Sequence, residues 1–240
     1  MGVILSVQQL EIKPGPHSLF RNLNLDFLPN QITAIVGENG VGKSSLLNCL
    51  SGTQPPRHGT VMLDGINLCS LSNRQRACLI SSIGQAEQTP DDLRVEARIA
   101  QGLAARLGFH VLLDKPTLVR VEKLCEELNI SHLLGRSFKN LSGGEKKRVH
   151  IARALIDEEP QVYILDEPDA GLDLRHRHAL NSILKKRSLL GKIILVTLHD
   201  LTLSQCLADR TIVLAKGFIA ADGPSQTVLT PEVMQEGFSV

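Results

Sequence analysis

The sequence is poor in aromatic residues, with six Phe, one Tyr and no Trp among 240 residues. Aromatic side chains are the surfaces on which the bases of single-stranded nucleic acids stack, so a platform of that kind is not expected. Neither sign of charge dominates, because 26 basic residues are balanced by 25 acidic ones and the net charge is +1. So balanced a chain gives no indication of electrostatic capture of nucleic acid or of an anionic lipid surface.

Cysteine pairs and long apolar runs are also missing. The cysteines are scattered, without a C-x-x-C pair or a histidine at metal-ligand spacing, at Cys49, Cys69, Cys78, Cys125 and Cys206. We expect them to be reduced side chains rather than disulfides or metal ligands. No stretch approaches the roughly 18 apolar residues of a membrane span, and the apolar N-terminus lacks the basic segment of a secretory signal. The chain is therefore expected to be soluble and cytoplasmic.

A glycine-rich loop between two apolar segments stands out among the features that are present. It follows residues 32–36, precedes residues 46–50, and consists of Gly37, Glu38, Asn39, Gly40, Val41, Gly42, Lys43, Ser44 and Ser45. Strand, glycine-rich loop and helix in this order are the context of a phosphate-binding loop, whose N–H groups turn inward as an anion nest. Lys43 would give a positive charge to the β- and γ-phosphates, and Ser44 a hydroxyl ligand for Mg²⁺. The alternative is a glycine-rich turn with a chance Lys-Ser pair.

Four polar residues come at the ends of predicted strands, where ligands bind in open α/β sheets. Asp166 and Glu167 follow the apolar run 162–165, Gln85 ends the strand at 79–83, and His199 comes after 193–196. Asp166 can hold Mg²⁺, and Gln85 can ligate the metal or orient a water. Glu167 is placed to polarise a water for attack on the γ-phosphorus, and His199 to bridge the γ-phosphate and the catalytic carboxylate. Each alone could be ordinary turn chemistry, but the four together favour a nucleotide-hydrolysing site.

The pattern along the chain predicts an α/β fold with a parallel sheet. Uninterrupted apolar runs at 162–165 and 193–196 are typical of parallel strands covered on both faces. Shorter segments at 4–12, 23–27 and 61–65 predict an N-terminal antiparallel sheet. From about residue 88 to 140 the spacing of apolar residues is typical of helices. One amphipathic face is formed by Val121, Leu124, Cys125 and Leu128. We therefore predict a single domain over 1–240, with a core from 1–87 and 141–240 and a helical insertion at 88–140.

Further elements are predicted from caps and end charges. The segment 71–78 is expected to form a short polar helix that Ser72 can cap. Another helix should follow residues 141–144. The helix between the two apolar runs should end with the charges of 185–187, which favour a helix C-terminus. Residues 211–214 form the last strand that the pattern predicts.

Taken together, these segments resemble the ATP-binding-cassette (ABC) ATPases over essentially the whole chain. The motifs that carry the resemblance are the Walker A loop at 37–45, the Q-loop glutamine Gln85, the signature at 141–145, Walker B at 162–167, the D-loop at 170–173 and the switch histidine His199. The resemblance implies a P-loop NTPase fold and Mg-ATP hydrolysis. It also implies a head-to-tail homodimer with two ATP molecules between the subunits.

The implied dimer gives the signature and the D-loop a role. Ser142, Gly143 and Gly144 open a helix, so their N–H groups and the Ser hydroxyl would form a second anion site. An ATP held between that site and the partner's Walker A loop would join the subunits. Asp173 would carry contacts across the dimer to the opposite Walker A region.

Within the family, three features resemble the ATPases of siderophore, haem and cobalamin importers: residues 71–77, residues 221–233 and the signature Glu145. The implied protein lies peripherally on the cytoplasmic face of the inner or plasma membrane. It works with transmembrane permease subunits, one helix of which would dock around 86–100, and with a periplasmic or extracellular solute-binding protein. No nucleic acid partner is expected.

Two other functions stay open at this point. One is a cytosolic ABC ATPase that drives a soluble assembly process, such as iron–sulfur cluster scaffolding. The other is a regulatory module without turnover, which the presence of Glu167 and His199 disfavours.

The sequence departs from the family pattern at three places. Residues 1–19 contain no Phe, Tyr or Trp to stack on adenine, so His17 is the only ring there. Lys147 stands where the family usually has Gln, and Asp169 stands where Ser or Thr is usual. Neither Lys147 nor Asp169 is expected to touch a group of the nucleotide site.

Overall fold

The computed structural model describes residues 4–12, 20–84, 92–108, 113–198 and 200–238. A six-stranded sheet lies at its centre, with the strand order β10-β9-β3-β8-β7-β6. The five strands from β9 to β6 are parallel, and β10 is added antiparallel at one edge. The strands are β3 (Gln31–Gly37), β6 (Ile80–Ile83), β7 (Val162–Leu165), β8 (Ile193–Thr197), β9 (Arg210–Ala215) and β10 (Phe218–Pro224).

Both faces of this sheet are buried, which explains the uninterrupted apolar runs. In β8, Ile194 and Val196 belong to one hydrophobic core, whereas Ile193 and Leu195 belong to the other. Successive side chains of a strand point to opposite faces, so a strand with a core on each side needs an apolar residue at every position. The parallel-sheet prediction is therefore confirmed.

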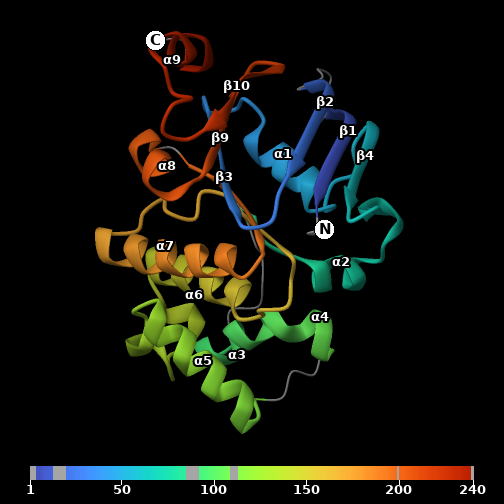
Figure 1. Cartoon of the computed structure of the whole chain (residues 1–240). Coiled ribbons are helices and arrows are strands. Elements are labelled where there is room, and N and C mark those ends of the chain that lie inside the picture. Colours follow the sequence, from blue (N-terminus) through green and yellow to red (C-terminus); the bar gives the residue numbers. More distant parts are fainter. Residues whose placement is uncertain (1–3, 13–19, 85–91, 109–112, 199, 239–240) are drawn as a thin grey trace.

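One face is covered by helix α1 and by a second sheet (Figure 1). The second sheet is antiparallel where β2 and β4 flank β1, and its strand order is β2-β1-β4-β5. Its strands are β1 (Leu5–Ile12), β2 (Phe20–Phe27), β4 (His58–Leu63) and β5 (Ile66–Asn67), and α1 spans Lys43–Leu50. The predicted N-terminal antiparallel sheet is thus present.

The other face is covered by helices, which lie mostly in the lower half of Figure 1. Among the described residues from 95 to 140, every regular element is helical: α3 (Val95–Ala100), the 3₁₀ turn η2 (Gln101–Leu103), α4 (Ala104–Leu107), α5 (Lys115–Glu127), and the 3₁₀ turns η3 (Ser131–Leu133) and η4 (Phe138–Asn140). They pack with α6 (Gly143–Leu155) and α7 (Leu174–Leu189). We call residues 92–140 the helical region; its assignment as an insertion stays a prediction. In the described part of the chain, no helix is long and apolar enough to cross a membrane.

The short helix α2 (Asn73–Leu79) has the predicted cap, because Ser72 and Gln75 form a reciprocal capping box. Three C-terminal elements were not predicted: β10, α8 (Leu201–Leu207) and α9 (Pro231–Phe238). The apolar residues of strand β10, at 218–221, are exposed or only partly buried, and the strand continues through Asp222, Gly223 and Pro224, residue types that are depleted in strands. The predicted end charges of α7 are present, because Lys186 and Arg187 lie in its last turn, and Arg187 is also buried.

Candidate functional site

The glycine-rich loop connects β3 to α1, as predicted. Lys43, the first residue of α1, is buried and curls back over the loop. Its Nζ donates to the carbonyl oxygens of Gly37 at 2.8 Å and of Glu38 at 3.0 Å. The ammonium group is therefore held above the loop backbone, where a phosphate group would also be held.

Glycine is required at two positions of this loop. Gly37 has φ +148°, and a Cβ there would lie 2.4 Å from the Leu214 carbonyl oxygen of the neighbouring strand. Gly42 caps α1 with φ 112° and offers no side-chain hydrogen bond to the first turn. The N–H groups that open α1 are thus left for a ligand, and the helix dipole favours an anionic one.

The acidic pair after β7 is fixed by a threonine on the next strand. Asp166 is buried, and its Oδ1 accepts a 2.6 Å hydrogen bond from the Thr197 hydroxyl. The same Thr197 oxygen accepts the Glu167 N–H at 2.7 Å. Glu167 has φ 47°, a left-handed conformation that is uncommon for a residue with a side chain. Thr197 had not been predicted as a site residue.

Lys43 and the two carboxylates lie close enough to affect one another. Burial lowers the pKa of Lys43, and the negative charges of Glu167 and Asp166 act in the opposite direction. A cavity of about 430 Å³ adjoins Asp166, between α1 and the end of β6. The structure thus brings together the parts of the site predicted from 37–45 and from 166–167.

The signature residues open α6, as predicted. Ser142 is the N-cap and its hydroxyl accepts the Glu145 N–H at 3.3 Å, while the Glu145 Oε2 accepts the Ser142 N–H at 2.8 Å. Hydrogen bonds to the Glu145 carboxylate, first from the Ser142 backbone N–H, then from the Ser142 side chain and from Arg136, lower the pKa of Glu145 to about 2. A Cβ on Gly143 would meet nothing within 4 Å, so the helix entrance is open. Among the described residues, no hydrogen bond joins 142–144 to the Walker A loop of the same chain.

Asp173 has a local structural function. It is the N-cap of α7, and its Oδ1 accepts the His176 N–H at 2.9 Å and contacts the His176 Nδ1 at 2.7 Å. These bonds lower its pKa. The carboxylate is still largely exposed, at 64%, and so is accessible to another chain.

Lys147 contacts the site, so the prediction that it touches no group there is wrong. From the second turn of α6, its Nζ donates to the carbonyl oxygens of Glu167 at 2.6 Å and of Ala170 at 2.7 Å. The only available sequence signal was its departure from the family pattern.

Several predicted positions lie outside the described residues. They are Gln85, His199, His17 and residues 86–91 of the proposed docking segment. Their predicted roles stay as predictions.

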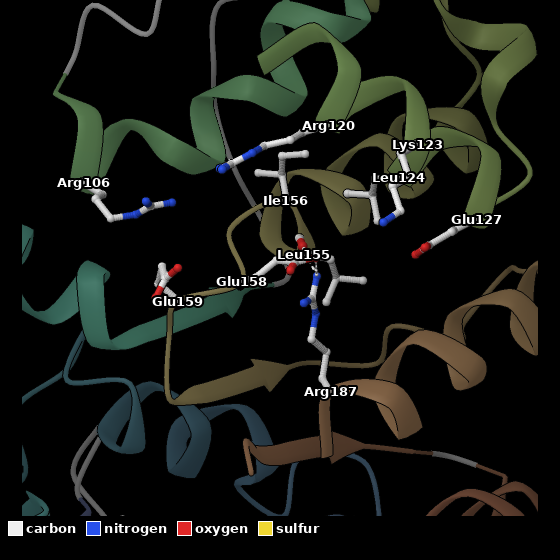
Figure 2. Close-up of a pocket in the computed structure, with 10 residues that line it drawn as sticks. All are labelled: Arg106, Arg120, Lys123, Leu124, Glu127, Leu155, Ile156, Glu158, Glu159 and Arg187. Atoms are coloured by element: carbon white, nitrogen blue, oxygen red, sulfur yellow. Dashed lines mark hydrogen bonds and ion pairs between the residues drawn. The ribbon is translucent and has the colours of Figure 1, made fainter. Parts of the chain in front are cut away.

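A second cavity, of about 240 Å³, lies where the helical region meets α6 and α7 (Figure 2). Its charged lining residues are of both signs: Arg106, Arg120, Lys123, Glu127, Glu158, Glu159 and Arg187. Because cations and carboxylates are nearly balanced there, the lining gives no preference for a ligand of either charge.

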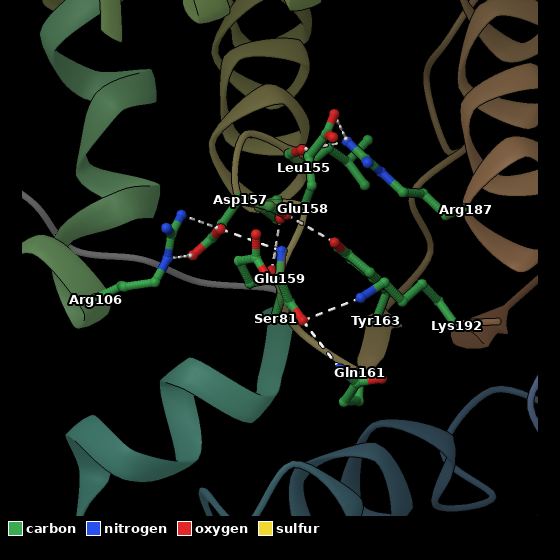
Figure 3. A network of polar contacts seen from close by, with 11 residues as sticks. Ser81, Arg106, Leu155, Asp157, Glu158, Glu159, Gln161, Tyr163, Arg187 and Lys192 are labelled. Carbon is green, nitrogen blue, oxygen red and sulfur yellow. Dashed lines mark hydrogen bonds and ion pairs between the residues drawn. The ribbon is translucent and has the colours of Figure 1, made fainter. Parts of the chain in front are cut away.

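The polar contacts beside this cavity join separate parts of the fold (Figure 3). Arg106 of α4 holds the buried Asp157 with two hydrogen bonds, of 2.6 and 3.2 Å. The Tyr163 hydroxyl of β7 donates to the Asp157 carbonyl oxygen at 2.7 Å. Arg187 of α7 bonds the Leu155 carbonyl oxygen and the Glu158 carboxylate. We call these contacts the junction network; it ties the helical region to the sheet.

Comparison with known proteins identifies the chain's relatives. The family profile described as "ABC transporter" matches residues 20–170. Hemin import ATP-binding protein HmuV of Bradyrhizobium diazoefficiens is 31% identical over 247 residues, covering 100% of this chain and 90% of the relative. HmuV of Pseudomonas aeruginosa is 34% identical over 241 residues, covering 99% and 93% respectively.

Solved structures agree with this fold. A nucleotide-free ATP-binding cassette from an ABC transporter superposes with a TM-score of 0.83 at 23% identity, covering 97% of this chain and 98% of that one. At that identity it supports the fold alone. A transporter described as of the metal-chelate type, in an inward-facing conformation, gives a TM-score of 0.80 at 26% identity and covers 98% and 89%.

Proposed function

Because this chain belongs to the ABC transporter family of ATP-binding subunits, we propose that it hydrolyses Mg-ATP to drive the import of a metal-chelate solute of the hemin type. The relatives named as hemin import proteins support this solute class. The importer assignment also agrees with the metal-chelate type structure neighbour.

One observation carries the chemical part of the proposal. A buried lysine at the start of α1 lies next to two carboxylates, one of which is buried and fixed by a threonine. This arrangement pairs a cation for phosphate oxygens with acidic oxygens for a metal ion and a water.

The residues present fit ATP and Mg²⁺. The open N–H groups at the start of α1, the loop 37–45 and Lys43 would hold the phosphates. Ser44, Asp166 and Gln85 would hold Mg²⁺, which neutralises phosphate charge when bound. Glu167 would accept a hydrogen bond from the attacking water, and His199 would lie against the γ-phosphate.

We further propose a head-to-tail homodimer. The exposed entrance of α6, with Ser142, Gly143 and Gly144, would bind the γ-phosphate of an ATP held by the partner. The Asp173 side chain is largely exposed although it caps α7, and it would contact the opposite Walker A region.

In the full system, the subunit would lie on the cytoplasmic face of the membrane, in contact with permease subunits. A periplasmic or extracellular solute-binding protein would deliver the solute to the permease. The permease would dock around residues 86–100. The described part of that range includes α3, which begins at Val95.

The test replaces the native protein, in cells that make it, by the Lys43→Ala or Glu167→Gln variant. We expect both to abolish energy-dependent hemin uptake, and purified Lys43→Ala to lose ATP affinity. Photocrosslinkers placed at 92–100 should recover the wild type in the membrane fraction, joined to a polytopic protein. Normal hemin uptake in cells that carry either variant would contradict the proposal that this protein drives hemin import. Recovery with soluble partners alone would favour the assembly ATPase.

A further inference from the structure

Lys147 links the signature helix to the acidic turn after β7. One Nζ donates to two carbonyl oxygens that are three residues apart, those of Glu167 and Ala170. The Ala170 N–H also donates to the Glu167 carbonyl oxygen, at 3.3 Å. The ammonium group therefore closes the turn 167–170 from outside the turn itself.

The turn needs such support because Glu167 has φ 47°. A left-handed conformation in a residue with a Cβ is strained and persists where the surroundings impose it. The two sides of this residue are held by different elements. Thr197 of β8 accepts its N–H, and Lys147 of α6 donates to its carbonyl oxygen.

Asp169, in the same turn, is the electrostatic counterpart of Lys147. Burial lowers the pKa of Lys147, and among the acidic groups around it Asp169 opposes that effect most, followed by Glu167 and Asp166. Asp169 is itself buried. Asp169 is a buried carboxylate and Lys147 a half-buried cation, and either would be costly without the other, so the two departures from the family pattern, at 147 and 169, belong together.

We propose that Lys147 is a positioning residue for Glu167: its hydrogen bonds to the 167 and 170 carbonyl oxygens hold the backbone from which the Glu167 carboxylate faces the attacking water, and Asp169 is its charge partner. This inference rests on the proposed ATP hydrolysis. The side-chain amide of a glutamine at position 147 could donate its N–H groups to the same two carbonyl oxygens. Because this amide is neutral, it would need no carboxylate at position 169. The pair Lys147–Asp169 should therefore be exchangeable, as a pair, for Gln and Ser.

The test compares kcat, the affinity for ATP and urea unfolding among Lys147→Met, Lys147→Gln, Asp169→Ser and the double variant Lys147→Gln with Asp169→Ser. Lys147→Met keeps an unbranched side chain as long as the lysine stem but lacks the terminal ammonium group and donates no hydrogen bond. We expect it to lower kcat by about 10- to 100-fold through the loss of its charge-assisted hydrogen bonds, with ATP affinity within about two-fold of the wild type. Lys147→Gln, especially with Asp169→Ser, should recover kcat to within about five-fold.

Lys146→Met is the matched control, because Lys146 is the preceding residue of α6 but its Nζ lies over the Phe138 ring, 5.4 Å from the centroid. We expect its kcat to stay within about two-fold of the wild type. A kcat of Lys147→Met equal to that of this control would overturn the proposal. So would a joint fall of kcat and ATP affinity that glutamine does not reverse, which indicates a structural role alone.

A second readout separates this inference from the proposed function. Amide hydrogen exchange of the segment 166–173 should be faster in Lys147→Met than in Lys146→Met, whether or not the protein turns over ATP. Absence of turnover in the wild type would reject the proposed function. Unchanged exchange in this segment would reject the positioning role even if the wild type hydrolyses ATP.

Discussion

At the scale of single residues, Thr197 joins the Asp166 side chain to the backbone of Glu167. Its hydroxyl donates to the Asp166 carboxylate while its oxygen accepts the Glu167 N–H. Since each partner uses a different hydrogen-bonding capacity of the hydroxyl, both contacts coexist. The carboxylate proposed for the metal is thereby fixed relative to the backbone of Glu167, the residue proposed to act on water.

Glu145 caps α6 with an acidic group whose pKa is lowered to about 2 from 4.5, first by the Ser142 backbone N–H. The unfolded chain binds the proton more tightly, so this contribution to stability is complete above about pH 4.5 and is lost as pH falls toward 2. Glu145→Gln keeps an acceptor but cannot titrate. We expect the wild type to be more stable at pH 7, by up to about 1 kcal/mol, and this advantage to shrink below pH 4.5.

Urea unfolding of the wild type and Glu145→Gln at pH 7, 5 and 3.5 measures the difference. Since both proteins share every other titrating group, other effects of pH cancel in the comparison. A gap that stays constant down to pH 3.5 would disprove the assigned pKa.

Some of these residues could be predicted from sequence and others could not. Lys43, Asp166 and Glu167 are recognisable because each stands at the end of an apolar strand or loop with a chemical reason to be there. Thr197 ends an apolar strand as an ordinary β-branched residue would. Its role depends on the register in which Leu165 pairs with Val196, because this pairing brings the ends of β7 and β8 together.

At the scale of elements, the junction network decides how the helical region is held. Arg106 is the contact from α4, and its partner Asp157 is 4% exposed. Removing a cation from a buried carboxylate leaves its charge uncompensated, which destabilises a protein strongly. Because Arg106 itself is about one third exposed, we expect Arg106→Ala to cost about 1–3 kcal/mol of unfolding free energy.

Arg120→Ala is the control for that measurement, because Arg120 lines the same cavity from α5 and is exposed. Its effect on urea unfolding should stay within about 0.5 kcal/mol. Equal effects of the two substitutions would mean that the Arg106–Asp157 contact adds no net stability.

Elements with a strong period were predictable, and those stabilised only by contact were not. The spacing of apolar residues predicts the amphipathic face of α5. Uninterrupted apolar runs predict that β7 and β8 are buried on both faces. By contrast, β10 exists because the backbone of β9 offers hydrogen-bond partners at the sheet edge. Likewise, the sequence predicts Arg187 as a charge at the end of α7, but it does not predict the tertiary hydrogen bond from Arg187 to the Leu155 carbonyl oxygen.

At the scale of the whole molecule, the proposed dimer predicts that the molar mass increases when ATP binds. Glu167→Gln should bind ATP without hydrolysing it and so keep the nucleotide between two subunits. We expect the molar mass from light scattering to double when Mg-ATP is added to Glu167→Gln. Adding Lys43→Ala to that variant should prevent the increase, because the nucleotide is then not held. A mass that stays at 26.2 kDa with Mg-ATP would contradict the dimer.

The chain has one tyrosine and no tryptophan, and that tyrosine lies in the junction network. Tyr163 is buried, and burial raises its pKa, so the phenol stays protonated while the fold persists. Tyrosine emission and the absorbance of the ionised phenol therefore come from one site, where the sheet meets the helical region. The protein carries a native optical probe of that junction, and a tryptophan placed elsewhere would be read without background from another indole.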